Sequence, residues 1–110
     1  MKKIEAIIRN ERLLPVKSSL EELGVMGMTV SEVHGRGEQK GLEFTHRAGT
    51  YRVDLLAKTK IEIVVEDSKV KGVVARIIES ARTGEIGDGK IFISSVEEVI
   101  RIRTGETCIE

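Results

Sequence analysis

Residues 60–65 read KIEIVV, and this stretch, with its near copy KIEAII at residues 3–8, decides the fold. In both copies every second residue is apolar, and a period of two is typical of a strand with one face against a core. The residues on these two apolar faces are Ile4, Ala6, Ile8, Ile61, Ile63 and Val65. We therefore expect two related strands, one in each half of the chain.

Each of these strands is followed by a helical pattern. The first begins near Pro15, which suits an initial helical turn, and Gly24 stands where a left-handed cap is expected. The second follows Asp67, a candidate N-cap, and Gly84 is placed to end it. The expected core-facing positions of the two helices are Val16, Leu20, Leu23, Val70, Val73, Val74, Ile77, Ile78 and Ala81.

A further strand follows each helix. Residues 26–31 alternate, with Met26 and Met28 as predicted core residues, and residues 91–94 form the fourth strand. Residues 96–105 close the ordered part of the chain. Two βαβ halves predict an α+β, ferredoxin-like βαββαβ sandwich with both helices on one face of an antiparallel sheet.

The second face of this sheet is predicted to be too apolar for full solvation. Such a face indicates self-association or coverage by a ligand. Its predicted residues are Ile7, Thr29, Val64 and Phe92 beside Glu5, Arg9 and Glu62.

A long segment, residues 34–55, separates the second and third strands. It holds both histidines and Tyr51, the only tyrosine, and it lacks strong strand or helix periodicity. Segments of this length within a compact domain are usually functional or disordered. We expect residues 36–54 to act as a flexible loop on a single domain spanning residues 1–110.

Composition limits the function classes. The chain has 18 basic and 18 acidic residues and 3% aromatic residues, which disfavours nucleic-acid binding. Its one cysteine, Cys108, excludes an intrachain disulfide and fits a reducing cytoplasm. No apolar run is long enough for a membrane span.

Two glycine clusters suggest a phosphate-bearing ligand. Residues 35–41 read GRGEQKG and residues 84–90 read GEIGDGK, and glycines beside a lysine allow backbone approach and a point charge. Neither matches a P-loop, and a tight turn explains each cluster equally well. Arg101 and Arg103, predicted on one side of one strand, suit polyphosphate, although surface ion pairs are the default explanation. Neither His34 nor His46 has a catalytic or metal-ligand spacing.

Three segments, TGEIGDGKIF at 83–92, VIRIRTGE at 99–106 and KTKIEIVV at 58–65, resemble the signature text of the PII nitrogen-regulatory signal proteins. This resemblance implies a homotrimer whose lateral clefts bind ATP or ADP, and a sensor rather than an enzyme. It also implies that Mg²⁺ and ATP create a site for 2-oxoglutarate. The loop would dock on an ammonium transporter, glutamine synthetase or other nitrogen-metabolism proteins, in the cytoplasm or recruited to the membrane by a channel.

The resemblance also assigns residues. Nucleotide binding falls to Ile7, Thr29, Gly35, Gly37, Gln39, Glu62, Val64, Gly87, Asp88, Gly89, Lys90, Arg101 and Arg103. Binding of 2-oxoglutarate falls to Arg9, Gln39 and Lys58, with Gln39 at the metal, and Tyr51 aligns with a tyrosine that is modified in some relatives.

Some positions depart from the family pattern. Glu38 replaces a common basic residue beside the phosphates, and Asn10 and Glu11 replace the usual proline and aromatic residue. Two alternatives stay open: a divergent PII-like trimer for another small ligand, and an acylphosphatase-like enzyme that would use Arg9 and Asn10. An RNA-recognition domain would need more exposed aromatic residues.

Overall fold

A computed structural model describes residues 1–36, 42–46, 49–53 and 55–108, with the backbone alone described between residues 42 and 53. The order of elements is β1 Lys2–Ile8, η1 Asn10–Arg12, α1 Leu13–Glu22, β2 Thr29–Gly35, β3 Leu42–His46, β4 Gly49–Val53, β5 Leu56–Val65, η2 Asp67–Lys69, α2 Val70–Ala81, β6 Gly89–Ser95, β7 Val99–Ile100 and β8 Thr107–Cys108.

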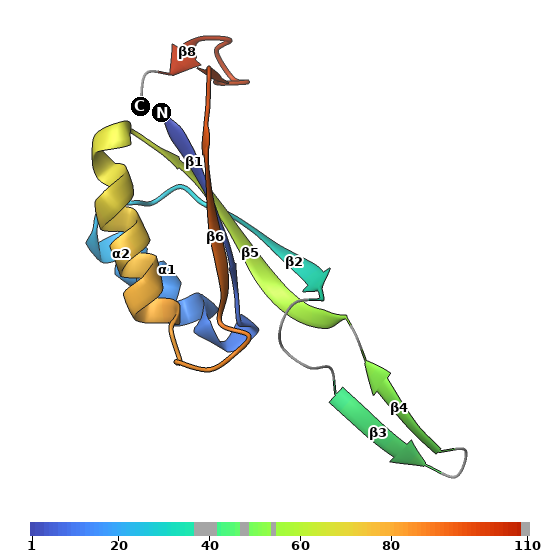
Figure 1. Ribbon diagram of the computed structural model, residues 1–110. Helices are drawn as coiled ribbons and strands as arrows, with labels where there is room; N and C mark the ends of the chain where they lie inside the picture. Colours follow the sequence, from blue (N-terminus) through green and yellow to red (C-terminus); the bar gives the residue numbers. More distant parts are fainter. Residues whose placement is uncertain (37–41, 47–48, 54, 109–110) are drawn as a thin grey trace.

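The main sheet has the strand order β2-β5-β1-β6 and is antiparallel throughout. Both helices lie on one face of it, as Figure 1 shows. Strand β1 is central, because Ile7 is paired with Lys60 of β5 on one side and with Lys90 of β6 on the other. This is the predicted ferredoxin-like arrangement.

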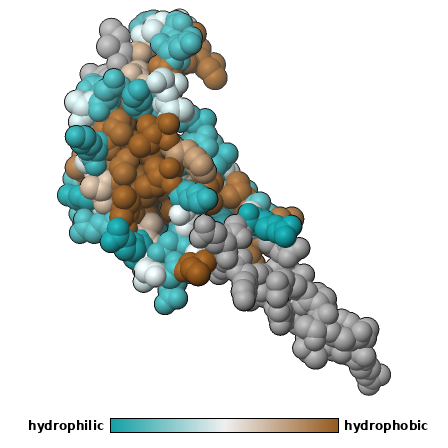
Figure 2. Space-filling model, in the orientation of Figure 1, coloured by the Kyte–Doolittle hydropathy of each residue, from teal (hydrophilic) through white to brown (hydrophobic). Residues whose placement is uncertain are grey.

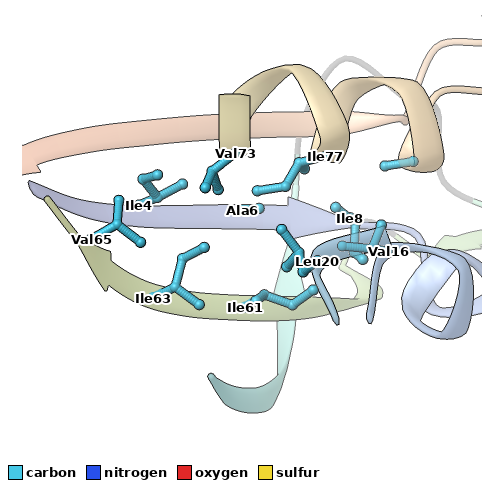
Figure 3. Close-up of a cluster of buried hydrophobic side chains, with 11 residues drawn as sticks. Ile4, Ala6, Ile8, Val16, Leu20, Ile61, Ile63, Val65, Val73 and Ile77 are labelled. Atoms are coloured by element: carbon cyan, nitrogen blue, oxygen red, sulfur yellow. The ribbon is translucent and has the colours of Figure 1, made fainter. Parts of the chain in front are cut away.

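The core lies between the sheet and the two helices. Its strand residues are those predicted from the alternating patterns, and Ile4 and Ala6 are 0% exposed. Helices α1 and α2 contribute Val16, Leu20, Val73, Ile77 and Ala81 to the same cluster (Figure 3). The period-two stripes predicted the strand core correctly, but two expected helical core residues are wrong. Leu23 is 40% exposed because α1 ends at Glu22, and Ile78 is 39% exposed because it faces the groove beside β6.

Several predicted boundaries are wrong. Asp67 is not a helix N-cap, because a 3-10 turn precedes α2 and the Asp67 carboxylate is paired with the amino group of Met1 at 3.1 Å. Helix α2 ends at Ala81, where Arg82 is extended, so Gly84 lies in the following loop instead of ending the helix. Strand β2 begins at Thr29, and Met26 is therefore 73% exposed instead of buried.

Strands also occur where the sequence patterns predicted none. Strands β3 and β4 pair with each other within the long segment between β2 and β5, and β5 itself begins at Leu56. These strands are short and mixed in polarity, which is why periodicity did not indicate them.

The C-terminal hairpin corrects a further prediction. Arg101 and Arg103 do not lie on one strand, because β7 ends at Ile100 and the chain turns back to β8. The turn is closed by hydrogen bonds between Arg101 and Gly105 and between Arg101 and Glu106, and Gly105 has a φ of 71°. Ile102 is consequently fully exposed.

An apolar patch remains on the surface between α2 and β6. Figure 2 shows it as a continuous brown area in the orientation of Figure 1. The residues of this patch line a groove of about 380 Å³, and they include Val74, Ile78, Ile91 and Ile93. Helix α2 therefore covers the helix-side face of β6 only in part.

Candidate functional site

A cleft of about 470 Å³ lies at the end of the sheet where β1 ends and β6 begins. One wall comes from the strands and the other from the loop that connects α2 to β6. The residues that line it include Ile7, Gly35, Leu56, Lys58, Ile86, Gly87, Asp88, Gly89, Lys90 and Phe92. Seven of these are predicted site residues, and the fold brings them together from four separate segments of the chain.

Gly89 lets the loop wall lie directly against β1. Its φ is 105°, and a Cβ at this position would lie 1.7 Å from the carbonyl oxygen of Ile7. A side-chain carbon cannot approach a backbone oxygen this closely. Gly89 is thus required by the packing of β6 on β1, and this turn places Lys90 at the cleft.

The loop is fixed by the carboxylate of Asp88. Its Oδ2 accepts hydrogen bonds from the amides of Thr83 and Gly84, both at 2.9 Å, and its Oδ1 accepts one from the hydroxyl of Thr83. The same Oδ1 pairs with Arg9 Nε at 3.0 Å. The hydrogen bonds from Thr83, followed by those from Arg9 and Gly84, hold the pKa of Asp88 well below its ordinary value, so the carboxylate is ionised.

Two cations of the predicted 2-oxoglutarate set contact this loop. Arg9 donates through Nη2 to the carbonyl oxygen of Ile86 at 2.8 Å, and Lys58 donates through Nζ to the carbonyl oxygen of Gly87 at 2.6 Å. Desolvation, followed by the nearby charge of Arg9, lowers the pKa of Lys58. An anion placed between these groups would relieve that charge repulsion.

Thr29, Glu62 and Val64 lie further along the sheet from the cleft. Thr29 is opposite Glu62 in the β2–β5 register, and Val64 lies two residues further along β5. Thr29 is six residues from Gly35 on β2, which is about 20 Å at ~3.3 Å per residue. Arg101 and Arg103 follow β7, beyond the far end of β6, and are thus separated from the cleft by the length of that strand.

Glu62 is part of an ion network on the open sheet face. Its carboxylate contacts Lys3 and Lys60, each at 3.1 Å, and Lys3 also pairs with Glu5 at 3.0 Å. These lysines keep two carboxylates together although Glu5 and Glu62 are directly opposite in the register. They also lower the pKa of Glu62, Lys3 contributing most.

The alternative enzyme hypothesis required Arg9 and Asn10 in a phosphate-cradling loop. Arg9 is held by Asp88, and the side-chain oxygen of Asn10 accepts a hydrogen bond of 2.7 Å from the hydroxyl of Thr59, which is 5% exposed. Asn10 is thus directed toward β5 and satisfies a buried hydroxyl group. This pair does not form a phosphate cradle.

Three predicted residues fall wholly or partly outside the described part of the chain. Gly37 and Gln39 lie outside it, and Tyr51 is described only as a backbone position of β4, opposite Phe44. Among the described residues, no group of three His, Cys, Asp or Glu side chains is arranged to hold a metal ion.

Sequence reasoning missed Thr83 and Ile86. Thr83 provides a hydroxyl and an amide to Asp88, and Ile86 provides an apolar wall and the carbonyl oxygen that Arg9 contacts. The spacing of Thr83 and Gly84 before Asp88 is the signal that could have identified the turn, since an aspartate often accepts amide hydrogen bonds within its own loop.

The two helices are too short or too polar to span a membrane. Within residues 1–36 and 55–108, neither α1 nor α2 has the length or apolar content that crossing a bilayer requires.

Comparisons with known proteins identify the family. Residues 1–106 match the family described as nitrogen regulatory protein P-II. The chain is 62% identical over 107 residues to nitrogen regulatory protein P-II 2 of Methanothermobacter thermautotrophicus, covering 97% of this chain and 93% of that one. It is 61% identical over 106 residues to the P-II protein of Microchaete diplosiphon, covering 96% and 95% of the two chains.

A solved structure shares the fold. The crystal structure of Arabidopsis thaliana PII bound to citrate superposes with a TM-score of 0.80 at 47% identity, covering 98% of this chain and 88% of that one. The matched relatives are named as regulatory proteins, and their family consists of signal proteins rather than enzymes. The chain belongs to the P-II nitrogen regulatory protein family.

Proposed function

We propose that this chain senses ATP or ADP together with 2-oxoglutarate, in clefts that form between the copies of a homotrimer. The observation that carries this proposal is the separation of Lys90 from Arg101 and Arg103, which are all predicted to bind phosphate. Lys90 is near the start of β6, whereas Arg101 and Arg103 follow the end of that strand. The strand from Lys90 to its end at Ser95 alone spans about 17 Å at ~3.3 Å per residue, so one chain does not bring Lys90 and the two arginines to the same phosphates.

A second copy solves this problem. A head-to-tail contact places the hairpin of one copy beside the cleft of the next, and such a contact forms a closed ring when the rotation is appropriate. In this arrangement Lys90 of one copy and Arg101 and Arg103 of its neighbour approach the same phosphates. The apolar groove between α2 and β6 is a surface that assembly of this kind can bury.

The chemistry of the cleft fits the two ligands. Lys90 and the close approach at Gly89 suit phosphates, and Arg9 and Lys58 suit the carboxylates of 2-oxoglutarate. Mg²⁺ with ATP would supply the oxygen-preferring metal that a 2-oxo acid chelates, and Gln39 is the residue proposed beside it. Because Mg-ATP and 2-oxoglutarate would share this site, the binding of each would change the affinity for the other.

Residues 36–54 are the proposed contact with targets. We propose a cytoplasmic protein that docks this segment on an ammonium transporter, glutamine synthetase or another protein of nitrogen metabolism. A transporter partner would also recruit the protein to the membrane.

Calorimetry tests the ligand specificity. We expect Mg-ATP and ADP to compete for one site, and 2-oxoglutarate to bind only when Mg-ATP is present. A heat of 2-oxoglutarate binding that is identical without Mg-ATP would contradict the shared site. Failure of both nucleotides to bind would reject the proposed function.

A mixing experiment tests the site between copies. Lys90→Ala and Arg103→Ala proteins should each bind ATP weakly. After the two are unfolded together and refolded at equal amounts, about a quarter of the clefts should regain both residues if each cleft draws on two copies of a ring. Regain of no sites in refolded trimers would show that each cleft uses one chain.

A further inference from the structure

The carboxylate of Asp88 is fully used within its own chain. It accepts from the amide and hydroxyl of Thr83, from the amide of Gly84 and from Arg9. A carboxylate with these donors has little capacity left for a ligand, and its negative charge would oppose direct contact with phosphate. Its position in the cleft therefore calls for another role.

Arg9 lies between Asp88 and the loop backbone. Its Nε contacts the carboxylate at 3.0 Å, while its Nη2 contacts the carbonyl oxygen of Ile86 at 2.8 Å. The side chains of Arg9 and Asp88 are only 17% and 24% exposed. These two contacts fix both the direction and the plane of the guanidinium group, which an isolated surface arginine would not keep.

We propose that Asp88 is a positioning residue, which does not touch ligand and which holds the Arg9 guanidinium group and the 83–88 loop in the orientation that receives the 2-oxo acid. This inference rests on the proposed function for the identity of the ligand. It assigns Asp88 an indirect role through Arg9, in place of contact with the nucleotide phosphates.

The proposal predicts a change in ligand affinity that is opposite in direction to the change expected from charge alone. Replacing Asp88 by asparagine removes a negative charge beside an anion site, which on Coulomb grounds alone tightens binding of an anion. Loss of positioning weakens it instead, because the freed Arg9 must be ordered again when the ligand binds. The direction of the change therefore separates the two explanations.

The first experiment needs no ligand. In the NMR spectrum of the wild-type protein, the Arg9 Nε–H group should give a resonance that exchanges slowly with water. We expect Asp88→Asn to remove this protection and Glu85→Gln to retain it, because Glu85→Gln removes one charge from the same loop without touching Arg9. Equal protection in wild type and Asp88→Asn would overturn the proposal, whether or not any ligand binds.

The second experiment measures affinity by calorimetry with Mg-ATP present. We expect Asp88→Asn to weaken 2-oxoglutarate binding about tenfold or more and to change nucleotide affinity much less, because a fixed arginine loses less freedom on binding. Unchanged or tighter binding of 2-oxoglutarate would overturn the proposal. If the wild type itself binds no 2-oxoglutarate, the proposed function fails and the NMR result still decides the role of Asp88.

A double-mutant cycle separates positioning from general destabilisation. Arg9→Lys keeps the charge but cannot bridge Asp88 and Ile86 together, so it should weaken 2-oxoglutarate binding without unfolding the loop. Adding Asp88→Asn to Arg9→Lys should then produce little further loss, since residues that act through one contact are not additive. Additive losses would show that Asp88 acts independently of Arg9. If Asp88→Asn does not fold, Arg9→Lys alone provides the test, and unchanged 2-oxoglutarate affinity in it would overturn the proposal.

Discussion

Replacing Gly89 by alanine should be among the most damaging single-methyl changes in this chain. The added Cβ would lie 1.7 Å from the carbonyl oxygen of Ile7, whereas real Cβ contacts stay beyond 3.0 Å, so the strands must separate by roughly 1.3 Å. The φ of 105° adds a backbone strain of about 1–3 kcal/mol for a residue with a side chain. Loss of one or two hydrogen bonds between β1 and β6 adds about 1 kcal/mol each.

These contributions sum to a loss of about 2–5 kcal/mol in the free energy of unfolding. For a domain of this size, that corresponds to a decrease in Tm of at least about 8 °C, at ~4 °C per kcal/mol. Thermal unfolding followed by circular dichroism measures the change, at one protein concentration for all variants because association affects Tm.

Alanine substitutions at two other glycines separate the effect of the contact with Ile7 from that of backbone strain. Gly24 has a φ of 89° but nothing within 4 Å of its added Cβ, so Gly24→Ala should cost only about 1–2 kcal/mol from backbone strain. Gly27 has open space and no positive φ, so Gly27→Ala should be close to neutral. A loss in Gly89→Ala no larger than that in Gly24→Ala would refute the argument that the contact with Ile7 decides the effect.

Three further outcomes are expected. Asn10→Ala should destabilise the protein by about 1–2 kcal/mol in urea unfolding, because it leaves the buried hydroxyl of Thr59 without its acceptor; an unchanged midpoint would contradict this. Ile77→Ala should cost about 2–5 kcal/mol and Ile78→Ala much less, since the two residues are 1% and 39% exposed, and similar losses would contradict the assigned core. Stability should decrease below about pH 4, because the pKa of Asp88 is lowered in the folded state, so the unfolded state binds more protons as the pH falls toward the folded pKa. Asp88→Asn should reduce that dependence when Tm is measured from pH 6 to pH 2, and an identical slope would show that other carboxylates cause it.

The central features of the fold could be predicted from the sequence because their patterns report burial directly. The alternation in residues 3–8 and 60–65 fixes which side chains face the helices, and a shift by one residue would expose all of them. Helix ends were predicted less well. Aspartate is a residue type that is common at N-caps, but Asp67 lies in a 3-10 turn and its carboxylate pairs with the amino group of Met1. This contact joins residues that are far apart in the sequence, so local propensity does not predict it.

The sequence predicts most of the residues that belong to the site, but not which of them contact each other. The glycine cluster at residues 84–90 predicts a turn against a ligand, and residues 85–90 line the cleft. The pairing of Arg9 with Asp88 connects positions 79 residues apart, and no local pattern indicates which carboxylate receives a given arginine. For Arg101 and Arg103, the alternation with isoleucines resembled a strand, while the positive φ at Gly105 allows a turn that local alternation does not reveal.

Strand β5 connects the hydrophobic core to the cleft. It runs without interruption from Leu56 to Val65, and its core half is packed under both helices. Lys58 lies near the other end, two residues from the point where the chain leaves toward β4. Residues 59–62 of this strand pair with both β1 and β2, whereas Leu56, Ala57 and Lys58 pair with β2 alone. The cleft lysine therefore lies on the part of β5 that a single neighbouring strand holds, beside the exit of the chain toward β4.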